Sequence, residues 1–516
     1  MSLLQLTIPA QDGDRTSIRI RPREVKDWLE NLPFLDLQRT ARLVREQLRL
    51  MNRQPMPASQ RLGILGEFLA AYQRLEEALT NDQPLASQLR HLCQDIAFGY
   101  KIVIHDLVNR PSGFMEGRNL PMALLGAVHV LGLQLLDCYT AYRRAPRALW
   151  SECLELYRYA WQQGRETFRG ELPGYGEQQI DASFRLIALL HLADPYHLPG
   201  GMAEAMSGYF RERVDLCAVH SEPPENKNCF ALRERFQESD DNRPLKLYLE
   251  IDALLERMQT DTLKLQQAQQ APAIGLRREI PAAALLCSLG QIVEQWRHHP
   301  TRHTDREQTH ARIELVCGLD AVYCMVNQGR CFDPAKYLAA GHEQHIDLGV
   351  HPADDGSVQK APEPFICTSI NRSNGGLALR YCGVQMPHPR VGQLMALRRP
   401  GPQAHAGWVV AVCRWLIEAE SDKGFELGLQ YLTREPHAVV IRTQDSSGVS
   451  GPFQPAIAAV QKRGEQRVHT LITRSGENLR AGVRINVYEQ GRQQQAVCGE
   501  KLESGPGFER LLYQAD

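Results

Sequence analysis

The stretch T-S-I-N-R-S-N-G-G-L-A-L-R-Y, from Thr368 to Tyr381, decides how the C-terminal half of the chain is interpreted. Two apolar runs flank a polar centre at Asn371–Gly376, which predicts a strand, a tight turn and a second strand. Gly375 and Gly376 can adopt a positive φ and allow another molecule to approach the backbone closely. Asn, Ser and Gly also favour turns for purely local reasons, so the turn alone indicates only a hairpin.

Asn371 and Ser373 add chemistry to this turn. They are two residues apart, so their side chains point to the same side of an extended segment. An amide and a hydroxyl together form a compact hydrogen-bonding edge. Such an edge suits a planar polar ligand, for example a nucleobase.

Two neighbouring segments strengthen the case for a ligand site. Upstream lies R-H-T-D-R, Arg302 to Arg306, an R-x-x-x-R pattern that alone is typical of a solvated basic linker. Downstream, Gly407 to Leu432 contains two strand-like runs, V-V-A-V-C-R-W and L-G-L-Q-Y-L, around a polar turn. In this order, R-x-x-x-R, N-x-S-x-x-G and the two strands, the segment resembles the PilZ domain. PilZ domains are small β-barrels that bind the bacterial second messenger cyclic di-GMP.

The resemblance implies specific roles for these side chains. The guanidinium groups of Arg302 and Arg306 would bind phosphate oxygens bidentately or the Hoogsteen edge of guanine. Asn371, where the family also uses aspartate, would accept from a guanine N–H, and Ser373 would add a donor or acceptor. Gly376 would permit close approach of the ligand. The implied site consists of Arg302, Arg306, Asn371, Ser373, Gly375 and Gly376.

The C-terminal half is otherwise predicted to be β-rich. A longer polar insertion at residues 327–361 departs from the family pattern by widening the separation between its two motifs. Residues 444–516 are predicted to form an extension of the barrel or a second small barrel, with strand candidates at Val468–Thr473, Ala481–Tyr488 and Gln495–Gly499. Earlier strand candidates, several rich in β-branched residues, are Ala311–Leu319, Ala321–Val326, Pro364–Ile370, Leu377–Tyr381, Gln393–Leu397, Gly407–Leu416 and Phe425–Leu432.

The N-terminal half shows helical periodicity. Apolar residues recur at three- and four-residue spacing from about Pro22 to His299, which predicts a helical bundle or an irregular solenoid. No chemical motif appears there, and a surface for docking a protein partner is the functional alternative to a purely structural role. The last helix, Glu279–Trp296, ends before Pro300. The two arginines of the R-x-x-x-R pattern therefore lie in a linker, where a ligand bound to linker and barrel can fix the angle between them.

Composition limits the other classes of function. The chain has 516 residues and a net charge of −1, so nothing global indicates a nucleic-acid polymer or an anionic membrane surface. The N-terminus lacks the pattern of a signal peptide. The uncharged stretch between Arg118 and Asp137 approaches membrane-spanning length, but His129 and Gln134 interrupt it, which favours a buried helix. The thirteen cysteines form no C-x-x-C pair and are expected to be reduced, mostly buried thiols of a cytoplasmic protein.

No enzyme motif is evident. The segment His342 to His345 has H-x-x-H spacing, which is not the H-E-x-x-H of zinc proteases. Another group of histidines, His298, His299, His303 and His310, lacks a carboxylate or cysteine spaced to complete a metal site. There is no G-x-S-x-G, Walker or dinucleotide-binding fingerprint. A hydrolase remains an alternative, but we expect no enzyme, no metal and no cofactor.

The sequence therefore predicts an α+β multidomain protein. Its expected parts are an all-α helical bundle or solenoid at 1–299, a PilZ-like β-barrel domain at 300–443 with the insertion at 327–361, and the C-terminal β extension or second barrel at 444–516. The resemblance implies a cyclic di-GMP receptor that relays second-messenger level to a protein partner, through the helical domain, in motility, pilus or biofilm control. The alternative is an adaptor whose degenerate PilZ domain binds no nucleotide. Neither a nucleic-acid polymer nor a membrane span is expected.

Overall fold

The computed structural model describes residues 4, 6–11, 21–79, 82–109, 116–225, 227–233, 245–298, 306–339, 361–383, 389–401, 407–418, 424–444, 450–463, 466–476, 479–489 and 492–515. The chain divides into two compact units. The first comprises Met1–Pro195 and Gly201–His298, and the second comprises Tyr196–Gly200 and His299–Asp516.

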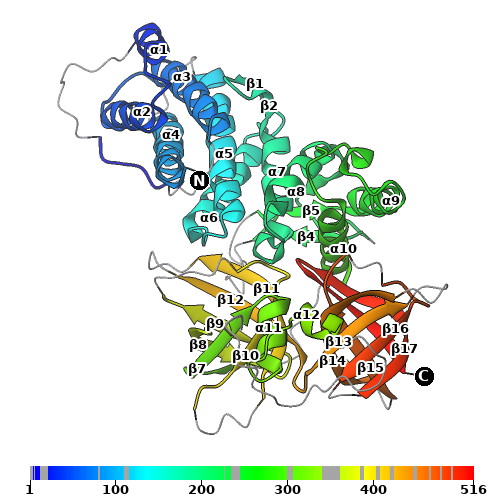
Figure 1. Ribbon diagram of the computed structural model, residues 1–516. Coiled ribbons are helices and arrows are strands. Elements are labelled where there is room, and N and C mark those ends of the chain that lie inside the picture. Colours follow the sequence, from blue (N-terminus) through cyan, green and yellow to red (C-terminus); the bar gives the residue numbers. More distant parts are fainter. Residues whose placement is uncertain are drawn as a thin grey trace. The chain divides into compact units, whose positions relative to one another are not determined.

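The first unit is mainly helical (Figure 1). Its helices are α1 (Pro22–Glu30), α2 (Leu37–Asn52), α3 (Ala58–Glu77), α4 (Gln83–Asn109), α5 (Glu116–Thr140), α6 (Arg147–Gln162), α7 (Ile180–Leu192), α8 (Met202–Arg211), α9 (Asp252–Ala268) and α10 (Ala282–His298). Local signals set some of their starts. Pro22 occupies the first turn of α1, and the Asp36 carboxylate caps α2 by accepting from the Arg39 amide.

Helical periodicity positions the core of this unit. On α2, Ala41, Val44 and Leu48 are buried at the spacing of one helix face. α4 packs against α2, α3 and α5. Two small sheets interrupt the helices, a hairpin of β1 (Arg169–Leu172) and β2 (Gly176–Gln179), and a three-stranded sheet of β3 (Ala218–His220), β5 (Tyr248–Glu250) and β4 (Cys229–Ala231). The unit is thus not purely α-helical, although helices make most of it.

The long apolar helix of the sequence is α5. By length and composition, residues Arg118–Thr140 are long and apolar enough to cross a membrane, and 56% of their most apolar window is buried within the structure. α5 packs against α4, α6 and α7. This packing gives its apolar side chains protein partners, as expected for the core helix of a helical domain.

The second unit begins with a ring of six antiparallel strands. They are β7 (Arg312–Cys317), β8 (Phe365–Arg372), β9 (Gly376–Tyr381), β12 (Phe425–Thr433), β11 (Val409–Glu418) and β10 (Leu394–Arg398), and β10 pairs back with β7. A two-residue strand, β6 (Glu307–Gln308), adds to the end of β8. The strand–turn–strand predicted for Thr368–Tyr381 is confirmed as the β8–β9 hairpin.

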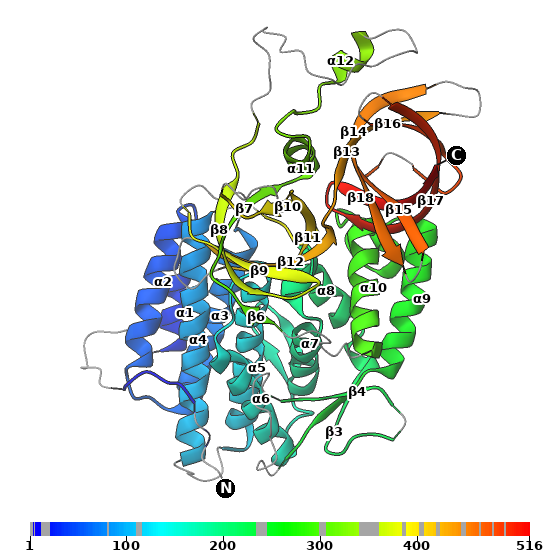
Figure 2. The ribbon, with the colours of Figure 1, turned by 90° about the horizontal axis from the view of Figure 1, so that it is seen from below.

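A second, closed barrel follows. Its strand order is β13 (His437–Gln444), β14 (Ser450–Arg463), β15 (Gln466–Thr473), β18 (Phe508–Ala515), β17 (Arg492–Gly505) and β16 (Arg484–Glu489). Figure 2 shows this barrel nearly end on, as a ring of strands. Of the two alternatives for the C-terminal residues, the structure has the second small barrel. The boundary expected between residues 443 and 444 falls inside β13, whose pairing with β14 and β16 makes it part of this barrel.

One predicted strand is wrong. Ala321–Val326 lies in a helix, α11 (Leu319–Val326), because Leu319, Val322 and Tyr323 are spaced to bury one helical face. Gly318, with a φ of 90°, ends the preceding strand. α11 packs against strands of both barrels, and its apolar face joins a core that also contains Phe508.

The polar insertion begins next to α11. Cys324 and Cys331 form a disulfide, so the expectation that every cysteine is a thiol is wrong for this pair. A short helix, α12 (Pro334–Ala339), follows. The remainder of the insertion, residues 340–360, lies outside the described residues. The overall prediction of an N-terminal helical region followed by a C-terminal β-barrel region is confirmed.

Candidate functional site

The turn between β8 and β9 is held by backbone hydrogen bonds. The Ser373 amide donates to the Gly376 carbonyl at 2.9 Å, which closes the hairpin. The Tyr431 amide of β12 donates to the Gly375 carbonyl at 2.9 Å, and the Arg434 guanidinium donates to the Asn374 carbonyl at 3.0 Å. The turn is therefore fixed to the neighbouring strand on one side and presents its other groups outward.

Strand pairing brings Arg306 to this turn. In the antiparallel pairing of β6 with β8, Glu307 lies opposite Arg372 and Gln308 opposite Asn371. One step further along the same register, Arg306 comes to the level of the turn. Arg306 and Asn371 are 65 residues apart in the sequence, and the two residue pairs of the β6–β8 ladder bring them close together.

The buried Ser369 hydroxyl supports this pairing. It accepts from the Ala311 amide at 2.9 Å and from the Thr309 hydroxyl at 2.7 Å. The Ser369 side chain is only 2% exposed. These bonds lock the segment that leads from β6 into β7 against β8, so they position Arg306 indirectly.

Alternation from the end of β8 into the turn separates two kinds of side chain. Asn371 and Ser373 are both half-buried and line one cavity, whereas the exposed Arg372 between them does not. Arg372 instead forms an ion pair with Glu307 at 2.7 Å. The predicted common direction of Asn371 and Ser373 is confirmed, and Arg372 is excluded from their site.

The cavity has a volume of about 230 Å³. Asn371, Ser373, Gly375 and Gly376 line it, together with Arg306. Further lining residues are His197, from the short segment that belongs to this unit, and Leu377, Ala378, Arg414, Trp415, Gly428, Leu429 and Gln430. The described residues that line it include two arginines and no carboxylate, so the cavity suits an anionic ligand.

The two glycines differ from expectation. Neither Gly375 nor Gly376 is among the described residues with positive φ. A Cβ on Gly376 would overlap the Leu429 carbonyl of β12, whereas a Cβ on Gly375 would meet nothing within 4 Å. Close approach at Gly376 is therefore made by the neighbouring strand, and Gly375 is the position with open space beside it.

Five of the six predicted site residues lie around this one cavity. The sixth, Arg302, lies outside the described residues, as does the linker at 299–305. The prediction that a ligand bound to this linker fixes the angle between the domains therefore falls on residues that the structure does not describe. Whether these residues bind the ligand stays a prediction.

The structure adds residues that the sequence analysis did not select. Arg414 and Trp415 come from β11, and Gln430 from β12. Trp415 pairs with Gly428 across the strands, and its indole occupies the space that a Cβ on Gly428 would take. Arg414 and Trp415 stand in the quoted V-V-A-V-C-R-W run, but only the strand register places these two residues beside the turn.

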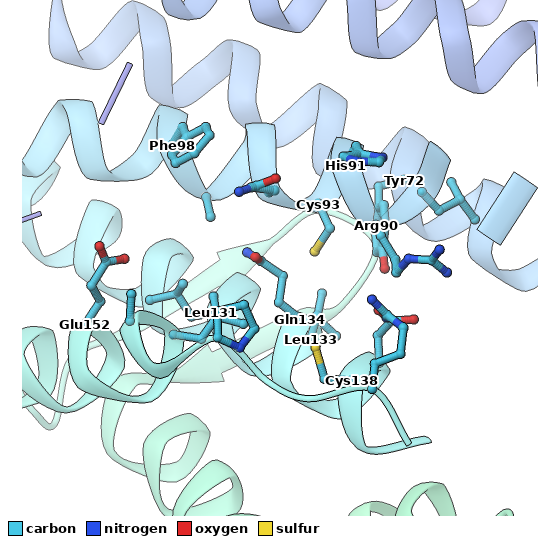
Figure 3. Close-up of a pocket in the computed structure, with 18 of the residues that line it drawn as sticks. Tyr72, Arg90, His91, Cys93, Phe98, Leu131, Leu133, Gln134, Cys138 and Glu152 are labelled. Atoms are coloured by element: carbon cyan, nitrogen blue, oxygen red, sulfur yellow. The ribbon is translucent and has the colours of Figure 1, made fainter. Parts of the chain in front are cut away.

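A second cavity, of about 330 Å³, lies within the helical unit (Figure 3). Figure 3 shows Gln134 of α5 beneath α4, with Cys93 and Phe98 across from it. Three carboxyl side chains line this cavity, Glu76, Asp137 and Glu152. Glu152 is paired with Lys101 at 2.7 Å, and burial raises the pKa of Asp137 although Arg143 opposes the shift. Arg90, Lys101, Arg143 and Arg144 also line it, so this cavity carries charges of both signs.

Metal binding has no support in the part of the chain that the structure describes. Within it, no group of three or more His, Cys, Asp and Glu side chains could hold a metal ion. The segment His342–His345 lies outside the described residues, as do His299 and His303 of the other histidine group.

The fold and the cavity together define a class, a helical domain followed by two β-barrels, the first with an arginine-lined pocket. Residues 23–225 match the family described as the cyclic-di-GMP receptor FimW, N-terminal domain. Over 99% of its length the chain is 21% identical to the cyclic-di-GMP receptor FimW of Pseudomonas aeruginosa, of which the match covers 93%. The predicted relationship to a cyclic-di-GMP receptor family with an N-terminal domain is thereby confirmed.

A solved structure also matches in part. It is described as "MrkH, a novel c-di-GMP dependence transcription regulatory factor". The match covers 41% of this chain and 88% of that chain, at 9% identity and a TM-score of 0.14. A TM-score this low does not establish a shared fold.

Proposed function

We propose that this chain is a cyclic di-GMP receptor and that the ligand binds in the cavity formed by the β8–β9 turn, Arg306 and β11–β12. The observation that carries the proposal is the meeting of Arg306 with Asn371 and Ser373 around one cavity, whose described lining residues include no carboxylate. The names of the matching family and of its relative from Pseudomonas aeruginosa agree with this ligand.

The chemistry of the cavity fits the parts of the ligand. Arg306 supplies a planar fork of donors for a phosphate. The Asn371 amide and the Ser373 hydroxyl supply the acceptor and donor groups that a guanine edge requires. The Trp415 indole and the arginine faces offer surfaces on which a purine can stack. We further propose that the first barrel is a PilZ domain and that Arg302 joins the site from the linker.

The output of the receptor is a second part of the proposal. The proposed domains are the helical domain at 1–299, the first barrel with the insertion at 327–361, and the second barrel, which begins with β13 at His437. The helical domain contacts a protein partner. The expected setting is cytoplasmic control of motility, pili or biofilm formation, without turnover of the nucleotide. The resemblance to PilZ receptors supports this part of the proposal. The alternative remains an adaptor whose barrel binds no nucleotide.

Calorimetry on the full chain separates these alternatives. Saturable, micromolar or tighter binding of cyclic di-GMP supports the receptor, with cyclic di-AMP as a control for base recognition. Absence of binding favours the adaptor. Chromatography of the nucleotide after incubation gives a separate answer on catalysis, because recovery of linear or monomeric products would indicate a hydrolase.

A further inference from the structure

Arg414 lines the proposed ligand cavity and is also attached to the second barrel. It belongs to β11, and its Nε donates to the Gln430 side-chain oxygen at 2.6 Å. Its Nη1 lies 2.7 Å from an oxygen of Glu503, on β17 of the second barrel. The Arg414 side chain is 40% exposed and that of Glu503 is 14% exposed. One arginine thus connects the cavity with a mostly buried carboxylate of another domain.

Glu503 has a second cationic partner. Its other carboxylate oxygen lies 3.6 Å from Nη2 of Arg510, on β18 of the same barrel. Burial lowers the pKa of Arg510, the Glu503 carboxylate opposes this shift, and the charge of Arg414 adds to it. The carboxylate is therefore shared between two arginines, one from each barrel.

This shared carboxylate lies where the barrels meet. β17 is irregular there, with register shifts between Cys498 and Lys501 and between Lys501 and Glu503. Just beyond, Gly505 packs so closely on the Gly392 carbonyl that a Cβ would overlap it. Phe508, after the same turn, is fully buried in the core that the two barrels share. A shift of Glu503 would therefore alter the packing of Gly505 and Phe508 at the contact between the barrels.

A bound phosphodiester changes this balance. A phosphate in the cavity offers Arg414 a second anion, and a guanidinium forms charge-assisted hydrogen bonds with either one. Glu503 would not be left as an unpaired buried charge, because Arg510 remains beside it. The exchange of partners is thus available without a large desolvation cost.

We infer that Arg414 is a further ligand-binding arginine, that Glu503 competes with the bound phosphate for it, and that occupation of the cavity transfers Glu503 towards Arg510. The second barrel thereby senses the ligand. This inference rests on the proposed function. It adds Arg414 to the ligand site and couples ligand binding to the second barrel, in addition to the turn and the linker.

Two substitutions test the competition on the full chain, with cyclic di-GMP as the titrant. Glu503→Gln removes the competing charge and should tighten binding about five-fold, the ratio expected for a partly exposed ion pair. Arg414→Gln should weaken binding about ten-fold or more, because a charge-assisted contact to the phosphate is lost. In the Arg414→Gln background, Glu503→Gln should leave the affinity unchanged.

Glu509→Gln is the matched control. Glu509 lies in the same hairpin of the second barrel, is similarly buried and pairs with Lys501 at 2.8 Å. This variant should bind like the parent. If Glu503→Gln does not fold, Glu503→Asp, which is one methylene shorter and withdraws the carboxylate from Arg414, should show the same tightening.

Hydrogen exchange provides the readout of coupling. Addition of ligand should change exchange in β17 and β18 of the parent, and this change should be absent in Glu503→Gln. Equal affinities of the parent, Glu503→Gln and Glu509→Gln overturn the inference, as does parental affinity in Arg414→Gln. A parent that does not bind cyclic di-GMP at all instead refutes the proposed function on which the inference depends.

Discussion

The Leu429 carbonyl of β12 approaches the Cα of Gly376 so closely that no side chain fits between them. Gly376 lies opposite Gln430 in the β9–β12 pairing, next to Leu429. Gly376→Ala should therefore destabilise the barrel by about 1–3 kcal/mol, the usual cost of overpacking. Urea unfolding of the full chain, followed by intrinsic fluorescence, measures this loss.

Gly375→Ala is the control for this prediction. It adds the same methyl group one residue earlier, where nothing lies within 4 Å, and the backbone does not have a positive φ. Its stability should stay within about 0.5 kcal/mol of the parent. The structural role assigned to Gly376 is wrong if the two alanines cost the same.

Two serines of the same hairpin should behave in opposite ways. Ser373 faces the cavity, so Ser373→Ala should weaken cyclic di-GMP binding by about 1–3 kcal/mol and leave stability unchanged. Ser369 is buried and accepts from the Ala311 amide, so Ser369→Ala should destabilise the fold by about 1–3 kcal/mol. Calorimetric titration and urea unfolding of both variants check this contrast. A loss of stability in Ser373→Ala would contradict the binding role of Ser373 and indicate that this serine stabilises the turn.

Much of this hairpin could be anticipated because its determinants are local. Alternation predicts that Asn371 and Ser373 share a side and that Arg372 does not, and the structure agrees. The role of Gly376 could not be anticipated, because the strand that leaves no room for a side chain at this position lies more than fifty residues away in the sequence. A glycine in a ligand motif and a glycine under a neighbouring strand look the same in one sequence.

The same limit explains the other differences. Arg414 reaches the cavity through the register of β11 with β12 and of β12 with β9, which a single sequence does not specify. Ala321–Val326 contains the β-branched residues of a strand, but its tertiary setting between two barrels buries a helical face. The Cys324–Cys331 pairing likewise depends on how the chain turns after α11.

Arg306 and Arg372 provide a direct test of which arginine binds the ligand. Arg306 lines the cavity, so Arg306→Ala should lose about 2–5 kcal/mol of cyclic di-GMP affinity, and Arg306→Lys should also be impaired. Arg372 lies within the N-R-S-N-G-G turn itself but pairs with Glu307 on the other side. Arg372→Ala should therefore bind within about two-fold of the parent, since an exposed pair contributes little. Calorimetry on both variants would contradict the assignment if the order of their affinities were reversed.

The helical unit should lose stability in mild acid through His129. Its ring packs edge-on against Tyr175, and burial, followed by the charge of Arg211, lowers the pKa of His129 to about 4. The unfolded chain takes up the proton near pH 6.5 and the folded chain only near pH 4, so stability is complete above pH 6.5 and falls as the pH decreases through this window. Between pH 7 and pH 5 the expected loss is at most about 2 kcal/mol. His129→Phe retains a ring against Tyr175 but cannot titrate, so urea unfolding at both pH values should show a smaller difference in this variant. An unchanged difference would place the acid sensitivity in other groups and show that His129 titrates alike in the folded and unfolded chain.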